Sequence, residues 1–485
     1  MITLWALLQI IYILVVIVVC LRIIYDTDSF SKSLAYLLLV VLLPIFGMVF
    51  YLSFGINYRK RKLYSKKLII DDELSKRLKK DILGQSETAL NNARTTLKEY
   101  NKIINMMTTE TINSISDINE VELLLNGENK FPKVIETLKK AKHHIHIEYY
   151  IFENDTIGNQ IVDVLIEKAK EGVEVRFIYD DFGSRSVRGK MVKRMRKAGI
   201  QAFPFHRVIF IYLANRLNYR NHRKIIIVDG SEAFVGGINV SDKYINYPDR
   251  EQMYWRDTHL YLKGQSAYIL QHTFMCDWNF CANDRMGPTV DYFPPLPEMN
   301  SNNNKVVQIA ASGPDSRVPT VLYSLIQVIN QAKEEVLITT PYFIPGESMM
   351  DAISVAALGG VKVKLLVPGI SDSKLVNAAA RSYYNDLLEV GVEIYVYQKG
   401  FVHAKTLVVD RKIAVVGTAN MDYRSFDLNF EVNAIVYDKG IASALGDAFY
   451  EDIQFADYIE PKEWLDRNMG IQLMEKAARL MSPLL

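Results

Sequence analysis

The sequence predicts a mixed α/β protein made of two similar halves that follow an apolar N-terminal segment. Short apolar runs rich in β-branched residues alternate with helical stretches, as in βαβ units. This alternation occurs twice, with a period of roughly 190 residues, which indicates two domain-sized copies. Two charge-free stretches precede them. The chain has 485 residues, of which 49% are hydrophobic and 23% charged, a composition that excludes a largely disordered protein.

The N-terminal segment contains two apolar runs, residues 1–21 and 33–58, without a charged residue. Each run is longer than the roughly 20 residues that a helix needs to cross a hydrocarbon core. Four charged residues lie between the runs (Arg22, Asp26, Asp28 and Lys32), and the basic RKRK follows the second run at 59–62. Because basic residues favour the cytoplasmic side, we expect two transmembrane helices within 1–58 and a cytoplasmic body. A cleaved signal peptide is the alternative, but a second apolar run follows at once.

Charge is distributed unevenly along the chain. Residues 1–68 carry eight basic and two acidic residues, whereas the remainder carries 49 basic and 53 acidic residues. The basic excess therefore borders the predicted membrane segment, where it suits a lipid bilayer as partner. A mildly acidic body argues against nucleic acid as partner. Only three cysteines are present, too few for a disulfide framework.

The two copies are visible as matching strand-like runs. AKHHIHIEYYIF (141–152) and GVEVRFIYD (172–180) in the first copy correspond to AKEEVLITTPYF (332–343) and GVKVKLLVPG (360–369) in the second. We accordingly divide the chain into five parts: transmembrane helices (1–58), a basic juxtamembrane segment and helical connector (59–115), a first domain (116–285), a Pro- and Asn-rich linker (286–318) and a second domain (319–485). Within VELLLNGENKF (121–131), Asn126-Gly127 predicts a tight turn between two strands.

Each copy ends in the same polar motif. The first places His222, Lys224 and Asp229 ahead of Gly236, Gly237 and Asn239, and the second places His403, Lys405 and Asp410 ahead of Gly417, Thr418 and Asn420. The spacing HxKxxxxD, then six residues, then G-[GT]-x-N, is identical in both. One copy alone is weak evidence, but two inside an independent repeat predict a shared site.

These residue types suit chemistry on a phosphodiester. In each motif the His and Lys are two residues apart, so they share one face of a strand. Two lysines neutralise charge that develops on phosphate oxygens, one His attacks phosphorus, and the other His transfers a proton. Asn239 and Asn420 can donate hydrogen bonds to phosphate oxygens, and the glycines allow a ligand to approach the backbone. We expect neither a metal ion nor another cofactor. His144 and His146 share a strand face, but no further ligand lies at metal-site spacing.

The duplicated motif resembles the signature of the phospholipase D superfamily. NHRKIIIVDG (221–230), YWRDTHL (254–260), GFVHAKTLVVD (400–410), VGTANMDYRSFDLNFEVNA (416–434) and ARLMSPLL (478–485) are similar to segments of bacterial cardiolipin synthases. The resemblance implies two phospholipase-D-type α/β sandwich domains around one active site. It also implies that phosphatidylglycerol is the substrate, that cardiolipin is the product and that a phosphatidyl-histidine is the intermediate.

The resemblance also implies roles for particular residues. Asp257 and Glu431 are expected to support the two histidines, Asp229 and Asp410 to be structural, and Arg220 to contact a headgroup phosphate. His222 is expected to be the nucleophile and His403 the general acid and base, although the symmetric spacing leaves this choice open. The location implied is the bacterial cytoplasmic membrane, with a multi-pass anchor and cytoplasmic catalytic domains.

Three other functions remain open from the sequence. A phospholipase D or a phosphatidylserine synthase would use the same chemistry with a different acceptor. A membrane-tethered nuclease fits the acidic body poorly, and a non-enzymatic scaffold has no need of two His–Lys pairs. The C-terminal IQLMEKAARLMSPLL (471–485) is amphipathic, which suits a helix that either packs on the domain or lies on a bilayer.

Overall fold

The computed structural model describes residues 4–27, 30–52, 97–110, 115–205, 219–249, 251–282, 285–295, 304–371 and 373–482. The chain forms two compact units. The first comprises residues 1–69 with 208–219, and the second comprises residues 70–207 with 220–485. The predicted RKRK cluster at 59–62 lies outside the described residues.

The described residues of the first unit form one long apolar helix and two shorter ones. Helix α1 (Leu4–Asp26) has 23 residues and a mean hydropathy of 2.9, and it alone among the described helices is long and apolar enough to cross a membrane. The second apolar run is divided into α2 (Phe30–Leu42) and α3 (Pro44–Phe50). The break falls at Leu43 because Pro44 has no backbone N–H to continue the helix. The 13 residues of α2 extend about 20 Å, less than a hydrocarbon core of about 30 Å, so the predicted two-helix hairpin is not confirmed.

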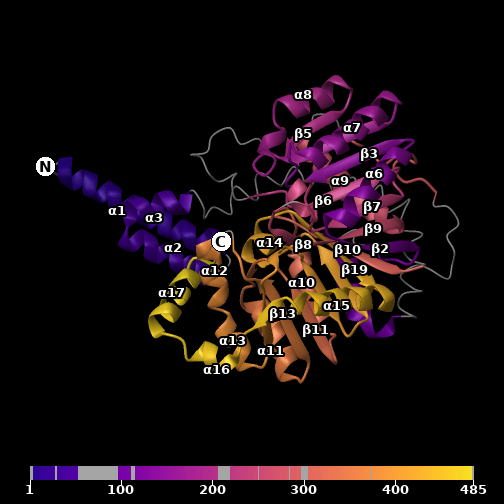
Figure 1. Cartoon of the computed structure of the whole chain (residues 1–485). Helices are drawn as coiled ribbons and strands as arrows, with labels where there is room; N and C mark the ends of the chain where they lie inside the picture. Colours follow the sequence, from indigo (N-terminus) through magenta and orange to yellow (C-terminus); the bar gives the residue numbers. More distant parts are fainter. Residues whose placement is uncertain are drawn as a thin grey trace. The chain divides into compact units, whose positions relative to one another are not determined.

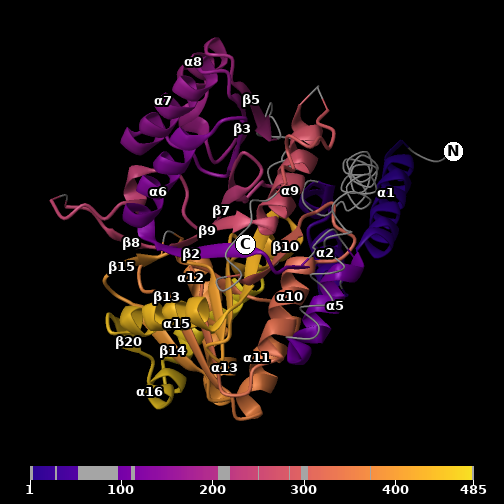
Figure 2. The same cartoon turned by 90° about the vertical axis from the view of Figure 1, so that its right-hand side faces the viewer.

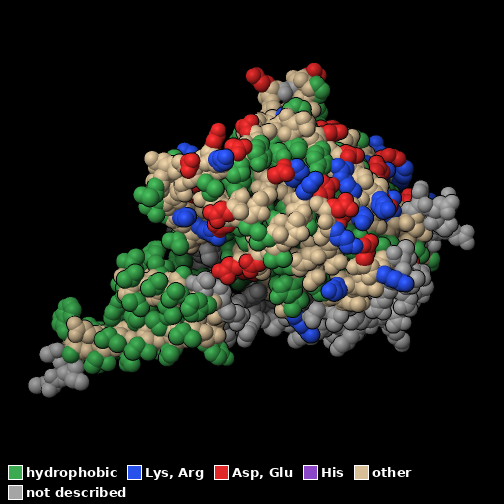
Figure 3. Space-filling model, turned by 90° about the horizontal axis from the view of Figure 1, so that it is seen from below, with side chains coloured by type: hydrophobic (Ala, Val, Ile, Leu, Met, Phe, Trp, Pro, Cys, Tyr) green, Lys and Arg blue, Asp and Glu red, His purple; other side chains and the backbone are tan. Residues whose placement is uncertain are grey.

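Hydrophobic side chains cover the outside of this first unit. In Figure 3 they form a nearly continuous apolar surface over the N-terminal helices. Trp5, Tyr25 and Phe30 are among the most exposed, at 77%, 84% and 82%. A small buried cluster of Val19, Ile23, Val40 and Tyr51 holds α1 against the shorter helices. An apolar surface of this extent indicates association with a membrane.

The second unit is built on two sheets of matching topology (Figure 1). The first sheet contains β2 (Asn119–Leu125), β3 (His144–Tyr149), β4 (Glu174–Asp180), β5 (Gln201–Phe205), β6 (Lys224–Val228), β7 (Glu232–Gly236) and β9 (Thr258–Gly264). Their order is β2-β9-β7-β6-β3-β4-β5, with β3, β4 and β5 parallel and the other pairs antiparallel. Four helices pack on it: α6 (Asn126–Lys140), α7 (Thr156–Lys170), α8 (Lys190–Lys197) and α9 (Gln265–Cys281).

The second sheet repeats this order and extends it at both edges. It contains β1 (Ile115–Ser116), β10 (Val306–Ser312), β11 (Glu335–Thr339), β13 (Lys362–Pro368), β14 (Glu393–Tyr397), β16 (Thr406–Val409), β17 (Ile413–Gly417), β19 (Glu431–Tyr437) and β20 (Ala456–Tyr458). The run β10-β19-β17-β16-β11-β13-β14 reproduces the order of the first sheet. The predicted tandem α/β architecture is therefore confirmed. The helices of this half are α10 (Thr320–Ile329), α11 (Glu347–Leu358), α12 (Lys374–Arg381), α13 (Tyr384–Glu389), α14 (Tyr423–Asp427), α15 (Lys439–Ile453), α16 (Pro461–Leu465) and α17 (Met469–Arg479) (Figure 2).

Two local predictions differ from the structure. Asn126-Gly127 does not turn between strands, because β2 ends at Leu125 and α6 begins at Asn126. Gly127 is needed there for close packing, since a Cβ on it would lie 2.4 Å from the carbonyl oxygen of Tyr244. The predicted linker 286–318 contains β10, which pairs with β19 along its whole length, so the second sheet includes residues that we assigned to the linker.

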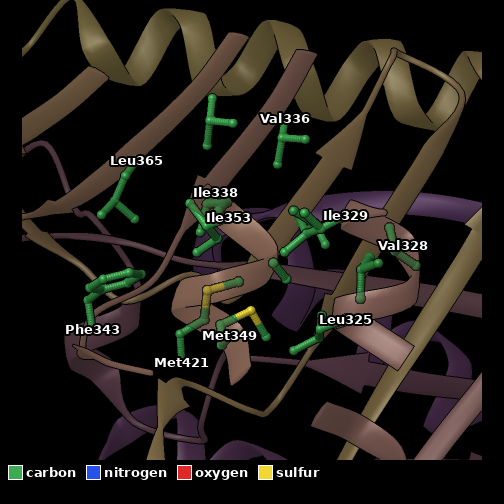
Figure 4. Packing of buried hydrophobic residues seen from close by; sticks show 14 of the residues in the cluster. Leu325, Val328, Ile329, Val336, Ile338, Phe343, Met349, Ile353, Leu365 and Met421 are labelled. Carbon is green, nitrogen blue, oxygen red and sulfur yellow. The ribbon is translucent and has the colours of Figure 1, made fainter. Parts of the chain in front are cut away.

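The core of the second half includes part of the segment 59–115, which we predicted to be a connector. Helix α5 (Asn101–Glu110) contributes Ile103, Ile104 and Met107 to it. Figure 4 shows the centre of this core, where side chains of α10, α11 and β11 converge, among them Leu325, Ile353 and Ile338. The apolar periodicity of these elements thus gives a rigid scaffold beneath the polar motifs.

Candidate active site

Each motif histidine lies immediately before a central strand. Lys224 is the first residue of β6, and His222 precedes it by two residues. In the second half Lys405 directly precedes β16, and His403 again lies two residues earlier. All four side chains are buried, with His222 and His403 each 8% exposed.

The acid that contacts each histidine comes from the opposite half of the second unit. Nδ1 of His222 donates to Glu431, at 2.9 Å from Oε1 and 3.0 Å from Oε2. Nδ1 of His403 donates to Oδ2 of Asp257 at 2.7 Å. Because a carboxylate only accepts hydrogen bonds, each histidine has its proton on Nδ1 and its lone pair on Nε2.

Main-chain pairing between the halves brings each histidine to its acid. Strand β15 (Gly400–Val402), which leads to His403, runs parallel to β8 (Tyr254–Arg256), which leads to Asp257. The N–H of His403 donates to the carbonyl of Arg256 at 2.7 Å. The same pairing brings His222 to Glu431. Asn221 forms a parallel β-bridge with Phe430, and the N–H of His222 donates to the carbonyl of Phe430 at 3.0 Å. The two His–acid pairs are thus assembled from both halves.

The two lysines are buried beside the histidines. Nζ of Lys224 donates to the carbonyl of His222 at 2.7 Å, and Nζ of Lys405 donates to the carbonyl of His403 at 2.5 Å. Burial lowers the pKa of Lys224 to about 7, aided by repulsion from Lys405 and opposed by Glu431. A phosphodiester anion in the pocket would raise this pKa again, so the free site is prepared for an anionic ligand.

Burial also controls the protonation of the histidines. It lowers the pKa of His222 to about 4, although Glu431 acts in the opposite direction. It lowers the pKa of His403 further below the usual range, together with repulsion from Lys405 and Lys224. Burial raises the pKa of Asp257 to about 6, while the nearby Lys405 opposes this rise. Near neutral pH both imidazoles are therefore neutral in the free site, as a nucleophile requires.

Asp229 and Asp410 lie outside the pocket, in equivalent turns. The Asp229 carboxylate accepts from the backbone N–H groups of residues 142, 143 and 144 at 2.8, 2.8 and 2.9 Å. The Asp410 carboxylate accepts from residues 333, 334 and 335 at 2.9, 2.8 and 2.9 Å. Both have positive φ, 48° and 49°. Asp229 therefore links the start of β3 to the turn after β6, and Asp410 links the start of β11 to the turn after β16.

The motif glycines leave room for neighbouring atoms of the protein, and the expected approach of a ligand to them stays a prediction. A Cβ on Gly237 would lie 2.1 Å from Oδ1 of Asp257, and one on Gly417 would lie 1.9 Å from Oδ1 of Asn433. Gly236, at φ 155°, lies against His259 in the same way. Gly237 therefore permits the acid behind His403 to reach its place.

Both histidines open into one cavity of about 470 Å³. Its lining includes Asn239, Asn420 and Arg220 from the predicted site. It also includes Tyr150, Ile151, Phe182, Lys243, Tyr244, Trp255, Tyr342, Ile344, Ser373, Val376, Phe401, Asp422, Arg424 and Asn429. Asn239 donates to the hydroxyl of Tyr244 at 2.6 Å and Asn420 to Asp422 at 3.0 Å, so part of their hydrogen-bonding capacity orients them within the wall.

Comparison with known proteins agrees with this geometry. A family model described as "Cardiolipin synthase, PLD-like domain" matches residues 134–268 and 325–453, and one described as "Phospholipase D-nuclease N-terminal" matches residues 2–55. The chain is 39% identical to the major cardiolipin synthase of Bacillus subtilis over 99% of both chains. It is 38% identical to a cardiolipin synthase of Alkalihalophilus pseudofirmus over 99% of this chain and 94% of that one.

The chain belongs to the cardiolipin synthase family of phospholipase-D-like proteins. A solved structure, the phosphatidylserine synthase of Haemophilus influenzae, superposes with a TM-score of 0.59 over 80% of this chain and all of that one. At 15% identity this likeness concerns the fold. The two matched segments of the family model contain both His–Lys pairs and both supporting acids.

The site also contains residues to which the motif gave no role, or which lie outside it. Thr418 and Asn429 donate to the Glu431 carboxylate at 2.5 and 3.2 Å, so they hold the acid that orients His222. The rings of Trp255 and Phe401 lie 5.7 and 5.9 Å from the ring of His403. Trp255 belongs to the YWRDTHL segment (254–260), so only the resemblance of that segment to the family could have indicated it.

The histidines of HHIH have another environment. His146 stacks on Phe274 at 4.6 Å between ring centroids, and its Nδ1 lies 3.0 Å from Oε1 of Gln271. Within the described ranges no three His, Cys, Asp or Glu side chains are grouped to hold a metal ion.

Proposed function

We propose that the protein is a membrane-associated cardiolipin synthase that transfers a phosphatidyl group from one phosphatidylglycerol to a second and releases glycerol. The observation that carries the proposal is the pair of buried histidines, each held by its own carboxylate, that open into one cavity with two lysines beside them. The named relatives support phosphatidylglycerol as acceptor, in preference to water or the alcohols used by phospholipase D and phosphatidylserine synthase.

The first step forms a covalent intermediate. Nε2 of His222 attacks the donor phosphorus, and the bond from phosphorus to the glycerol oxygen breaks. His403, protonated once the phosphate anion is bound, gives its proton to that oxygen. Glu431 stabilises the positive charge that develops on His222, and Lys224 and Lys405 neutralise the phosphate oxygens.

The second step regenerates the enzyme. His403 removes the proton from a glycerol hydroxyl of the acceptor, that oxygen attacks phosphorus, and the bond from phosphorus to Nε2 of His222 breaks. The choice of His222 as nucleophile rests on the resemblance, because both histidines have equivalent carboxylate partners. No step requires a metal ion.

The basic RKRK segment supports a cytoplasmic body attached through the N-terminal helices. A reporter fused after Lys67 should then be cytoplasmic, and a label at Asp28 should be accessible from outside. The opposite pattern would reverse this orientation.

Product analysis tests the activity. Purified full-length protein is incubated with phosphatidylglycerol, and lipids are identified by mass spectrometry. We expect cardiolipin and glycerol from the wild type and none from His222→Ala or His403→Ala. His143→Ala is the matched control, because His143 is half-exposed and does not line the cavity. Wild-type rates in either catalytic variant would contradict the shared site.

Trapping tests the order of the histidines. The quench must be alkaline, because phosphohistidine is acid-labile. In His403→Ala, supplied with a lipid whose leaving group is better than glycerol, we expect a phosphatidyl adduct on the peptide that contains His222. An adduct on His403 in the wild type would reverse the assignment.

A further inference from the structure

The guanidinium of Arg220 is a buried cation with one distant ion-pair partner among the described residues. Arg220 is 4% exposed and lines the cavity, and within the part of the chain that the structure describes its two terminal nitrogens make no hydrogen bond. The nearest carboxylate oxygen, Oδ1 of Asp180, lies 3.9 Å away, an ion-pair distance that is too long for a hydrogen bond. Leaving such donors buried is unfavourable unless a ligand accepts from them.

The described residues around Arg220 fix its position but do not accept hydrogen bonds from its terminal nitrogens. Asp180 accepts instead from the backbone N–H groups of residues 182, 183 and 221, at 3.0, 2.8 and 3.3 Å. The Phe182 ring packs against the guanidinium at 4.6 Å. Arg424 lines the same cavity and contributes further positive charge. A preorganised guanidinium fork of this kind matches a phosphate.

Arg220 lies close to His222, the proposed nucleophile. Its carbonyl accepts from the N–H of Phe430 at 2.8 Å, while the N–H of His222 donates to the carbonyl of Phe430 at 3.0 Å. This pairing makes residues 220–222 extended, so Arg220 and His222 are on one face and roughly 7 Å apart. The proposed reaction brings two phosphates together, one on the His–Lys centre and one on the acceptor, joined to its attacking hydroxyl by three carbons.

We propose that Arg220 binds the phosphate of the acceptor lipid and so selects an anionic lipid over water or a neutral alcohol. This inference rests on the proposed function. The positive charges of the site then have two roles. Lys224 and Lys405 neutralise the phosphate that reacts, and Arg220 binds the phosphate of the acceptor, which does not react.

The test measures how the phosphatidyl group is distributed among acceptors. Full-length wild type, Arg220→Lys and Arg220→Gln are supplied with phosphatidylglycerol and ethanol in mixed micelles, and cardiolipin, phosphatidylethanol and phosphatidic acid are quantified. In Arg220→Gln we expect cardiolipin to fall at least about tenfold relative to the other two products, with total donor cleavage within about twofold of the wild type. Arg220→Lys, which keeps the charge without the fork, should lie between them.

The control is Arg188→Gln, because Arg188 pairs with Asp181 at 2.8 Å and does not line the cavity. Equal loss of all three products in a variant that melts like the wild type would overturn the proposal and assign Arg220 to the donor phosphate. An unchanged product ratio would also overturn it. A wild type that cleaves phosphatidylglycerol without forming cardiolipin would instead refute the proposed function, and the acceptor role of Arg220 with it.

A second inference comes from α17, whose apolar face points away from the protein. Its polar face packs inward, where Glu475 is 5% exposed and accepts from Arg381 at 2.8 Å and Arg467 at 3.0 Å. The outer face presents large apolar side chains: Met469, Leu473, Met474 and Leu480 are 83%, 68%, 66% and 80% exposed. A surface helix of a soluble domain has the opposite orientation.

Helix α17 packs against an element of the cavity wall. Helix α17 packs against α12, and Val376 of α12 lines the cavity together with its N-cap residue Ser373 (Figure 1). Leu375 of α12 is 45% exposed, and the exposed Lys374 and Lys476 provide positive charge on the same two helices. Apolar side chains with basic residues beside them suit the interface of an anionic bilayer.

We infer that the outer face of α17 inserts into the surface of the bilayer from which the cavity takes its lipids. Full-length Leu473→Glu/Leu480→Glu is compared with wild type on phosphatidylglycerol vesicles and on a short-chain phosphatidylglycerol below its micelle concentration. We expect at least about a fivefold loss on vesicles and an unchanged rate on the monomeric lipid. The control is Leu358→Glu, which replaces an equally exposed leucine (72%) of α11. Equal effects on both substrates would overturn the inference, and so would a change in oligomeric state, which would assign the face to a second copy of the chain.

Discussion

Replacing Glu431 by Gln tests whether the acid from the second half orients the histidine of the first. Glu431 is fully buried and does not line the cavity. Its oxygens accept from His222, Thr418 and Asn429. In the Glu431→Gln variant a neutral amide replaces the carboxylate, so His222 loses the negative charge that its Nδ1–H faces, and one acceptor oxygen becomes an NH₂ donor.

The expected loss follows from the hydrogen bond that is removed. A hydrogen bond to a charged group contributes about 1.5–3 kcal/mol, which corresponds to a decrease in kcat of about 10- to 150-fold. The KM for phosphatidylglycerol should not change, because Glu431 acts on the lipid only through His222.

The assay measures initial rates of cardiolipin formation against the mole fraction of phosphatidylglycerol, with melting temperatures measured in parallel. Glu335→Gln is the matched control, since Glu335 accepts from Arg411 and Tyr450 in the same sheet, away from the cavity. A kcat for Glu431→Gln within about twofold of the wild type would refute the reasoning. A higher KM at unchanged kcat would refute it as well.

Three further outcomes are expected. Asp229→Ala should lower the free energy of unfolding by about 1–3 kcal/mol, because the carboxylate accepts hydrogen bonds from three backbone N–H groups away from the cavity. Thermal melting should show this loss, while the activity per folded molecule should not change. Gly237→Ala should lower kcat at least about tenfold, because the new Cβ would displace Asp257. Gly287→Ala is the control and should have no effect in the same assay, because its Cβ would meet no atom within 4 Å. The kcat/KM should fall as the pH rises through about 7, the pKa of Lys224 in the free enzyme, because the neutral amine no longer attracts the phosphodiester. The pH profile of kcat should remain flat to higher pH, because bound phosphate raises that pKa, and coincident profiles would contradict this account.

Local pattern was sufficient to predict the repeated architecture and the position of the two His–Lys pairs beside buried strands. The His–Lys pairs were found because they recur at identical spacing beside apolar strands, and the two sheets indeed share one strand order. The spacing inside each motif and the apolar run of each strand depend only on residues close together in sequence. Asp257 and Glu431 were found through resemblance alone, because each lies far along the chain from the histidine that it supports, 146 and 209 residues away.

Composition and local signals failed where packing decided the outcome. The second apolar run lacks charge, but Pro44 divides it into two short helices. Asn126-Gly127 has the residues of a hairpin turn, yet α6 begins at Asn126, and Gly127 is required there by the close carbonyl oxygen of Tyr244. Strand β10 was assigned to a linker, because its partner β19 lies more than a hundred residues later.

The amphipathic C-terminal segment shows the same division most clearly. The spacing of its apolar residues predicts a helix with two unlike faces, and α17 has them. Which face meets the protein is not a property of the helix, because the periodicity is the same in either orientation. It was decided by Arg381 and Arg467, which hold Glu475 against the domain and leave the methionines and leucines outside.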